Sequence, residues 1–379
     1  MSAGTLSSKP RTADVEIAGR RFEVGAPGFA AAIAQAYRDQ TRPRCLCRPD
    51  GLEMYIARLG AGYVVKRMPE TGRQHAPDCP SFEPAADSSG LGPLLGNAII
   101  EDPTTGAVTL KLAFPLSVRA GRVVPERTES TSGTVLSTGI RLSLRSLLHY
   151  LWDQAELTHW HPAFGGKRSW NTVRRHLLNA VERMLVCDHT LSTRFYAPET
   201  FSVEQRDAIN TRRRSAWTRS MEQLGNHRQL MLIVAEVKEI APARHGYKAV
   251  IKHMPDLAFA LDEVLYQGLS RRFSQELALW NASEDIRMMM IATFGLSSVG
   301  VPYLAALYLM PVTRQSLPVE TAFEQQLIAR LVRDRRAFLK ILRYDLRPDA
   351  RIASVALTDC GAPAPELFAG EEDGFLDSE

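Results

Sequence analysis

Three cysteines and one histidine, Cys45, Cys47, His75 and Cys79, constrain the N-terminal part of this chain more than any other feature. Thiolate and imidazole are the ligands that zinc prefers in closed structural sites, which are four-coordinate and tetrahedral. A β-hairpin expected at 51–68 would carry the chain out and back and bring the two halves of this set together. The sequence therefore predicts that residues 44–79 fold around one structural zinc ion, with no coordination position open for water.

The alternative for these cysteines is a set of buried thiols without a metal, because cysteine is among the residues most often fully buried. The residues around the four ligands are charged residues and prolines typical of loops: Arg44, Arg48, Pro49, Asp78 and Pro80. Cys187 and Cys360 are isolated, so the five cysteines are poor material for a disulfide framework. A metal site in a reducing compartment is the better interpretation.

The composition is that of a soluble globular protein. The chain has 379 residues, of which 45% are hydrophobic and 23% charged, enough for two or three folded units. The longest apolar stretches, around 288–294 and 303–312, have the length of strands, so no membrane span is expected. The first 15 residues lack the apolar segment of a secretory signal, and we expect a cytoplasmic protein.

Periodicity and composition divide the chain into successive segments. The predicted segments are a disordered N-terminus at 1–14, a zinc-binding module with the hairpin at 15–82, a linker and strands at 83–140, a helical unit at 141–228, an α+β sheet domain at 229–360 and an acidic mobile tail at 361–379. The predicted class is α+β. It combines a zinc-ribbon-like N-terminal module, a central helical unit that could be winged-helix-like, and a C-terminal mixed or antiparallel sheet with helices.

Individual elements follow from the same patterns. We predict strands at 15–24, 108–116, 230–237, 247–253, 286–294, 305–312 and 354–357, and helices at 27–37, 143–155, from 169 to 184, 202–224, 261–280 and 323–342. Ser143 is well placed to cap the helix that follows it. A long polar loop or hairpin is expected at 119–139.

Two stretches interleave basic and aromatic residues, a pattern typical of nucleic-acid binding because phosphates need positive charge and bases pack on flat rings. The candidate contacts are Lys167, Arg168, Trp170, Asn171, Arg174 and Arg175 in the first stretch, and Arg212, Arg213 and Arg214 near Trp217 in the second. The helix after Ser169 could be a recognition helix, with the helix at 143–157 supporting it. For each stretch the alternative is an ordinary solvated helix face.

A second class of function is a metal-dependent nuclease of the restriction-enzyme type, which needs an acidic residue and a Glu-x-Lys on adjacent strands. Glu236 and Lys238 lie on a predicted strand, and Asp256 follows the next strand. The usual order places the aspartate first, and a solvent-facing Glu-x-Lys is common by chance.

Near the C-terminus the residues Glu324, Lys340, Asp345 and Asp359 resemble fragments of another such core. No Glu-x-Lys follows Asp359, so a nuclease centre there would be incomplete.

Seven stretches of the sequence, at 45–55, 65–69, 75–83, 147–152, 167–170, 236–240 and 340–345, carry a resemblance to a known family. They include Cys-Leu-Cys-Arg-Pro-Asp-Gly-Leu-Glu-Met-Tyr from Cys45 and His-Ala-Pro-Asp-Cys-Pro-Ser-Phe-Glu from His75. The chain resembles the domain of unknown function 1173 family. This resemblance implies a gene on a bacterial plasmid or integrative element and does not imply an activity.

Together these patterns predict an accessory nucleic-acid-binding protein of a mobile genetic element with a structural zinc site. Its partner would be a nucleic acid of unspecified type, proteins of the same element could be further partners, and no membrane is involved. The alternative is a metal-dependent nuclease or an inactive scaffold derived from one. The sequence favours the role without catalysis. If the protein is a nuclease instead, the catalytic candidates are Glu236, Lys238 and Asp256.

Overall fold

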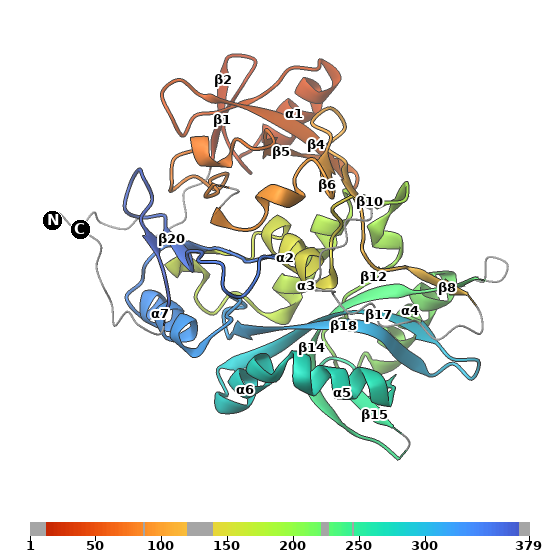
Figure 1. Cartoon of the computed structure of the whole chain (residues 1–379). Helices are drawn as coiled ribbons and strands as arrows, with labels where there is room; N and C mark the ends of the chain where they lie inside the picture. The colour runs from red at the N-terminus through yellow and green to blue at the C-terminus, as the bar shows by residue number, and fades with distance from the viewer. Residues whose placement is uncertain (1–12, 86–87, 120–138, 221–226, 245, 371–379) are drawn as a thin grey trace.

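The computed structural model describes residues 13–85, 88–119, 139–220, 227–244 and 246–370, and shows a mixed α+β protein (Figure 1). In these ranges no helix combines the length and the apolar character needed to cross a membrane. The loop predicted at 119–139 lies almost entirely outside the described residues, as do the predicted N-terminus up to residue 12 and the last nine residues of the tail.

The N-terminal module is a five-stranded sheet with one helix. Its strand order is β2 (Arg20–Glu23), β1 (Asp14–Ile17), β3 (Arg44–Cys45), β4 (Leu52–Leu59) and β5 (Gly62–Arg67), and α1 (Phe29–Arg38) packs on it. The hairpin predicted at 51–68 is confirmed as β4 and β5. The single strand predicted at 15–24 is wrong, because Ala18 and Gly19 have positive φ angles of 49° and 74° and turn the chain back on itself.

A small sheet has the order β11 (His189–Thr190), β10 (Met184–Val186), β7 (Val108–Leu110) and β6 (Ile99–Glu101), and two helices lie in the chain between β7 and β10. The predicted helices are confirmed as α2 (Leu144–Gln154) and α3 (Trp170–Val181). The hydroxyl oxygens of Ser143 and Ser169 cap these helices by accepting hydrogen bonds from the backbone N–H groups of Ser146 and Thr172. Strand β7 ends at Leu110, well before the predicted end at 116.

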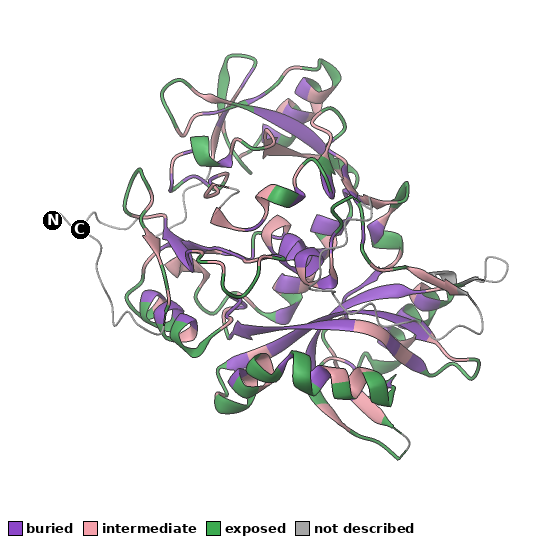
Figure 2. Ribbon diagram, in the orientation of Figure 1, coloured by how far each residue is buried: buried purple, intermediate pink, exposed green. Residues whose placement is uncertain are grey.

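The C-terminal sheet closes on itself. Its pairings run from β14 (Met231–Pro242) to β15 (Tyr247–Ile251), β16 (Ala258–Leu261), β18 (Pro302–Thr313), β17 (Ile286–Leu296) and back to β14, with β12 (Phe195–Tyr196) as an added edge strand. Most of these pairs are antiparallel, and β16–β18 and β12–β14 are parallel. Figure 2 shows the long central strands as mainly buried.

The helices around this sheet differ from the prediction in two places. The helix predicted at 261–280 is two helices, α5 (Glu263–Arg272) and α6 (Ser274–Ala282), which meet at Phe273, while the third predicted helix of the helical unit is α4 (Arg206–Ser220). The helix predicted at 323–342 ends early as α7 (Ala322–Arg333), because Arg335 adopts a positive φ of 59° and the chain continues as a strand.

The C-terminal segment adds one more small sheet. Its order is β21 (Glu366–Leu367), β20 (Val355–Leu357), β19 (Phe338–Lys340) and β9 (His159–Trp160), and a separate pair joins β8 (Ser117–Arg119) to β13 (His227–Gln229). The short helical turns are η1 (Gly72–Gln74), η3 (Gly92–Leu94), η4 (Pro162–Phe164) and η5 (Leu191–Thr193). Because β21 pairs with β20, the predicted mobile tail begins as an ordered strand.

One hydrophobic core includes residues from Leu94 to Tyr344 and joins the small sheet, α2, α3 and the C-terminal sheet. The N-terminal module has its own small cluster, in which Val15, Phe29, Ile33 and Ile56 pack together. The large core runs across the predicted boundaries at 140 and 228. The predicted division into domains remains a prediction.

Candidate metal centre and basic helices

The four predicted metal ligands come from two turns at one end of the N-terminal sheet. Cys45 ends β3, which is held between β1 and β4, and Cys47 lies in the turn that follows it. His75 directly follows η1, and Cys79 closes a turn in which its N–H donates to the carbonyl of Ala76 at 2.9 Å. Hairpin β4–β5 brings the two turns together, as the sequence predicts.

The four ligand atoms lie close together. Cys45 Sγ lies 3.7 Å from Cys79 Sγ, and His75 Nδ1 lies 3.4 Å from Cys47 Sγ and 3.6 Å from Cys79 Sγ. All four ligand atoms are within 4.8 Å of one another, and no other group of three or more His, Cys, Asp or Glu residues in the described part of the chain is placed to hold a metal. This geometry is compatible with a metal site.

The surroundings of the three sulfur atoms shift their pKa values in different directions, and burial raises the pKa of Cys47. The Cys79 thiol hydrogen-bonds to Cys45 and lowers the pKa of Cys45, while the same bond and burial raise the pKa of Cys79. Backbone N–H groups of Ala76 and Ser81 donate to Cys47 Sγ and Cys79 Sγ at 3.5 and 3.4 Å, an arrangement that stabilises negative sulfur.

The first basic stretch is partly structural. Arg168 donates to the carbonyls of Leu157 and Gln315 at 2.8 and 3.2 Å, and burial lowers its pKa to about 10. Trp170 is 7% exposed, and its Nε1–H donates to the carbonyl of Pro198 at 2.8 Å. Trp170, predicted as a nucleic-acid contact, is buried instead: its ring packs inside the core and stacks on His253.

The remaining residues of that stretch face solvent. Lys167, Asn171 and Arg175 are exposed, and Arg174 is half-buried, with its Nε–H donating to the carbonyl of Ala197 at 2.9 Å. Asn179 is also exposed, four residues after Arg175, so it continues the same helix face. The prediction missed Asn179, although its spacing from Asn171 and Arg175 was the available signal.

The second basic stretch lies on α4. Arg213 is 6% exposed and donates to both carboxylate oxygens of Asp256, at 2.9 and 3.4 Å, so it is a core residue and not an exposed contact. Arg212 is exposed and forms an ion pair with Glu199 at 2.7 Å, and Arg214 is exposed.

The structure brings the two basic stretches together at residues 197–199. Arg174 of α3 is hydrogen-bonded to Ala197, and Arg212 of α4 is paired with Glu199. Arg212, and more weakly Arg174, lower the pKa of Glu199. The segment 197–199 therefore contacts both helices, α3 through Arg174 and α4 through Arg212.

The nuclease candidates are engaged in ion pairs. Glu236 was expected to face solvent but is only 6% exposed, and its carboxylate accepts from Lys252 Nζ at 2.6 Å. Lys238 is exposed, and the strand pairing shifts by one residue between Val237 and Glu239. Asp256 is paired with Arg213, and among the described residues neither carboxylate belongs to a group of three potential metal ligands.

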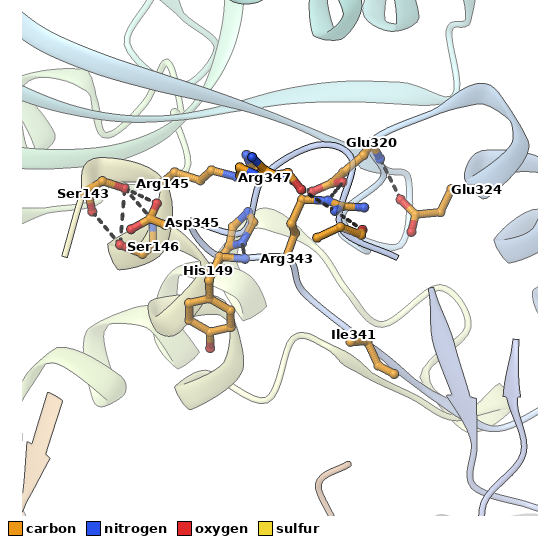
Figure 3. Close-up of polar contacts among 12 residues, drawn as sticks. Ser143, Arg145, Ser146, His149, Glu320, Glu324, Ile341, Arg343, Asp345 and Arg347 are labelled. Carbon is orange, nitrogen blue, oxygen red and sulfur yellow. Dashed lines mark hydrogen bonds and ion pairs between the residues drawn. The ribbon is translucent and has the colours of Figure 1, made fainter. Parts of the chain in front are cut away.

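The acidic residues near the C-terminus belong to a network of ion pairs that ties α2 to the C-terminal segment. Figure 3 shows Glu320 between Arg145 and Arg343, each of which donates to its carboxylate at 2.8 Å. Asp345 accepts a hydrogen bond from Ser143 Oγ at 2.6 Å.

The other acids of this region are also paired. Glu324 forms a buried ion pair with Lys340 at 2.9 Å, and Asp359 accepts two hydrogen bonds from Arg336, at 2.8 and 2.9 Å. These partners hold the fold of the C-terminal segment together. The fragments that resembled a second nuclease centre therefore do not converge on a common metal position in the described residues.

A family model described as "Protein of unknown function (DUF1173)" matches residues 15–374, nearly the whole chain. No curated protein and no solved structure matches the chain.

Proposed function

We propose that this chain, which belongs to the family described as protein of unknown function DUF1173, is an accessory nucleic-acid-binding protein whose N-terminal module is held by one structural zinc ion. The observation that carries the binding role is the exposed face of α3, with Asn171, Arg175 and Asn179 spaced one helical turn apart. The mobile-element setting remains part of the proposal and comes from the family resemblance alone.

Zinc fits the ligand set and its dimensions. In a tetrahedral site, bonds of about 2.3 Å to sulfur and about 2.0 Å to nitrogen place two sulfurs about 3.8 Å apart and a sulfur about 3.5 Å from a nitrogen. The corresponding separations here are 3.7 Å for Cys45–Cys79, and 3.4 and 3.6 Å for His75 to Cys47 and Cys79. Four protein ligands leave no open position, which supports a structural and not a catalytic role.

The exposed residues of α3 have the chemistry of base and phosphate contacts. Asn and Arg are the side chains that make bidentate hydrogen bonds to adenine and guanine edges, and exposed cations bind phosphates. Lys167, just before α3, and Arg212 and Arg214, on α4, are further exposed cations. The hairpin β10–β11 directly follows α3, as the wing follows the recognition helix in winged-helix proteins.

The alternative of a nuclease has less support, because Glu236 and Asp256 are each neutralised by a basic partner. A nuclease of the restriction-enzyme type needs carboxylates that are free to bind Mg²⁺.

The experiment is fluorescence anisotropy of labelled duplex and single-stranded DNA over a salt series. The test variant is Lys167→Ala/Arg175→Ala, which removes two exposed charges whose side chains make no hydrogen bond to any described residue. The matched control is Arg271→Ala/Arg333→Ala, which removes two exposed arginines from α5 and α7. We expect wild type and control to bind alike, and the test variant to bind more weakly, with a slope of log affinity against log salt smaller by about 0.9 per lost contact on duplex DNA.

Failure of wild type to bind either DNA at low salt would overturn the proposed function. Equal salt slopes for wild type and the test variant would show that Lys167 and Arg175 do not contact the DNA, and α3 would no longer be the proposed interface.

A further inference from the structure

The two ends of helix α3 differ in charge. Asn171 and Arg175 are exposed in its first half, and the exposed cation Lys167 lies shortly before its first residue. At the other end Glu182 is an exposed acid, and an ideal Cβ at Gly60 would lie 3.5 Å from its Oε2, so the turn of hairpin β4–β5 lies beside this end. The helix dipole is also positive at the N-terminus. The N-terminal end of α3 therefore attracts a polyanion, and the C-terminal end does not.

The exposed polar side chains of α3 are not explained by contacts within the fold. Asn171, Arg175 and Asn179 make no hydrogen bond or ion pair with any described residue. Asparagine is a weaker helix former than alanine, lysine or glutamate, which are the usual residues of a purely solvated helix face. Two asparagines on one exposed face therefore lower the stability of the helix, as is expected where a face serves binding.

The direction of the side chains places Asn171 and Arg175 at the same end of the helix. In an α-helix each Cα–Cβ bond tilts towards the N-terminus, so a side chain covers the turn before its own Cα. Arg175 begins one turn, about 6 Å, after Asn171, and its longer side chain reaches back over that turn. The short side chain of Asn179 reaches only the turn that contains Arg175. Asn171 and Arg175 can therefore contact one target at the N-terminal end, whereas Asn179 cannot.

The N-terminal end of α3 fits the major groove of B-form DNA. This groove is about 12 Å wide, and a helix with its side chains is about 10–12 Å across. Gly165 and Gly166, in the segment that leads into α3, are exposed, and an ideal Cβ at Gly166 would meet no described atom within 4 Å. The approach to this end is therefore open. The deep, narrow major groove of A-form RNA does not admit side chains in this way.

We propose that α3 enters the major groove of duplex DNA with its N-terminal end and reads bases there, Asn171 contacting an adenine and Arg175 a guanine. The amide of asparagine forms paired hydrogen bonds with N6 and N7 of adenine, and the guanidinium of arginine with O6 and N7 of guanine. The two bases lie within about two base pairs of each other, because a helical turn of about 6 Å spans about two base-pair steps. This inference rests on the proposed nucleic-acid-binding function and adds that the target is a duplex of preferred sequence.

Base contacts and phosphate contacts have different consequences for binding. A phosphate contact strengthens binding to every sequence, whereas a base contact strengthens binding to the sequence that carries that base. Lys167 precedes the helix and is assigned to phosphates. On DNA without the preferred sequence Arg175 has no guanine to contact, and its charge then lies near phosphates, as in the salt-series experiment. Loss of Asn171 should therefore change the preferred sequence, and loss of Lys167 should not.

The test is selection of duplexes bound by the full chain from a library with a random central segment, followed by sequencing. Wild type should enrich a short motif that contains an adenine and a guanine within about two base pairs of each other. Asn171→Ala should lose the preference at the adenine, and Arg175→Ala at the guanine. The preference is the ratio of the affinity for the selected duplex to that for a duplex with this base pair changed, and it should fall at least about fivefold in each variant.

Two control variants separate base reading from other effects. Asn179→Ala removes the same side chain as Asn171→Ala from the same exposed face, two turns further along the helix. It should keep the wild-type preference. Lys167→Ala should weaken binding to all sequences by a similar factor and also keep the preference. All four positions are exposed, and circular dichroism shows whether each variant is folded.

Duplex binding without any enriched motif would overturn this inference and leave the proposed function standing, whereas absence of DNA binding would overturn both. A preference that survives in folded Asn171→Ala or Arg175→Ala would also overturn the inference. The same holds for a preference that Asn179→Ala alters as much as Asn171→Ala does, and for tighter binding of single strands than of duplexes.

Discussion

The buried ion pair between Lys340 and Glu324 gives the sharpest test of the claim that the C-terminal acids are structural. Their side chains are only 3% and 8% exposed, and Lys340 Nζ also donates to the carbonyl of Ile341. In Lys340→Met the carboxylate of Glu324 would stay buried with a single N–H donor, that of Glu320. Breaking one side of a buried pair costs about 3–5 kcal/mol, because the remaining charge is left uncompensated.

The compensating variant is Glu324→Gln/Lys340→Met, which removes both charges and keeps an acceptor for the Glu320 N–H. We expect its free energy of unfolding to lie closer to wild type than that of Lys340→Met, because no uncompensated buried charge remains. The assay is urea unfolding followed by circular dichroism. A loss below about 1 kcal/mol for Lys340→Met, or a double variant no more stable than the single one, would refute the reasoning.

Three further predictions test other parts of the structure. Cys47→Ser should speed amide hydrogen exchange in residues 13–85 more than elsewhere, whereas Cys187→Ser, at an exposed cysteine, should not. An increase in exchange of the same size along the whole chain would contradict a local role for the metal. Burial first, then Glu83, raise the pKa of Asp153 in the fold to about 7 from 3.8, against the lowering effects of Tyr344 and Arg67. As pH rises from about 4 to 7, Asp153 therefore ionises in the unfolded chain before it ionises in the fold, which should lower the free energy of unfolding by up to about 4 kcal/mol. Asp153→Asn should flatten this pH dependence in urea unfolding. Gly106→Ala should cost about 1–3 kcal/mol, because Gly106 has φ +75° and the new Cβ would lie 2.4 Å from Ala57 Cβ; an unchanged thermal midpoint would contradict this contact between the N-terminal module and the β6–β7 turn.

Local signals in the sequence predicted local structure well. Ser143 and Ser169 mark helix starts because a hydroxyl cap acts within three residues, and the turn at Gly60 marks the β4–β5 hairpin. The metal ligands could be identified because zinc chemistry restricts the residue types and the hairpin implies the return of the chain.

Features set by distant partners could not be predicted. The basic residues around Trp170 and Arg213 in the sequence favour nucleic-acid contacts, yet the carbonyl of Pro198 and the carboxylate of Asp256 hold these two side chains in the core. The same limit applies to Asp153 and Glu83, which line one cavity only because the N-terminal module packs on the remaining chain.

The central claim is that one structural zinc ion holds the N-terminal module, and elemental analysis by mass spectrometry of protein purified without added metal tests it most directly. We predict close to one zinc per chain for wild type and for Cys187→Ser, and a marked loss of zinc for Cys47→Ser. A wild-type sample that is fully folded and free of metal, or that holds a different metal in equal amount, would contradict the claim.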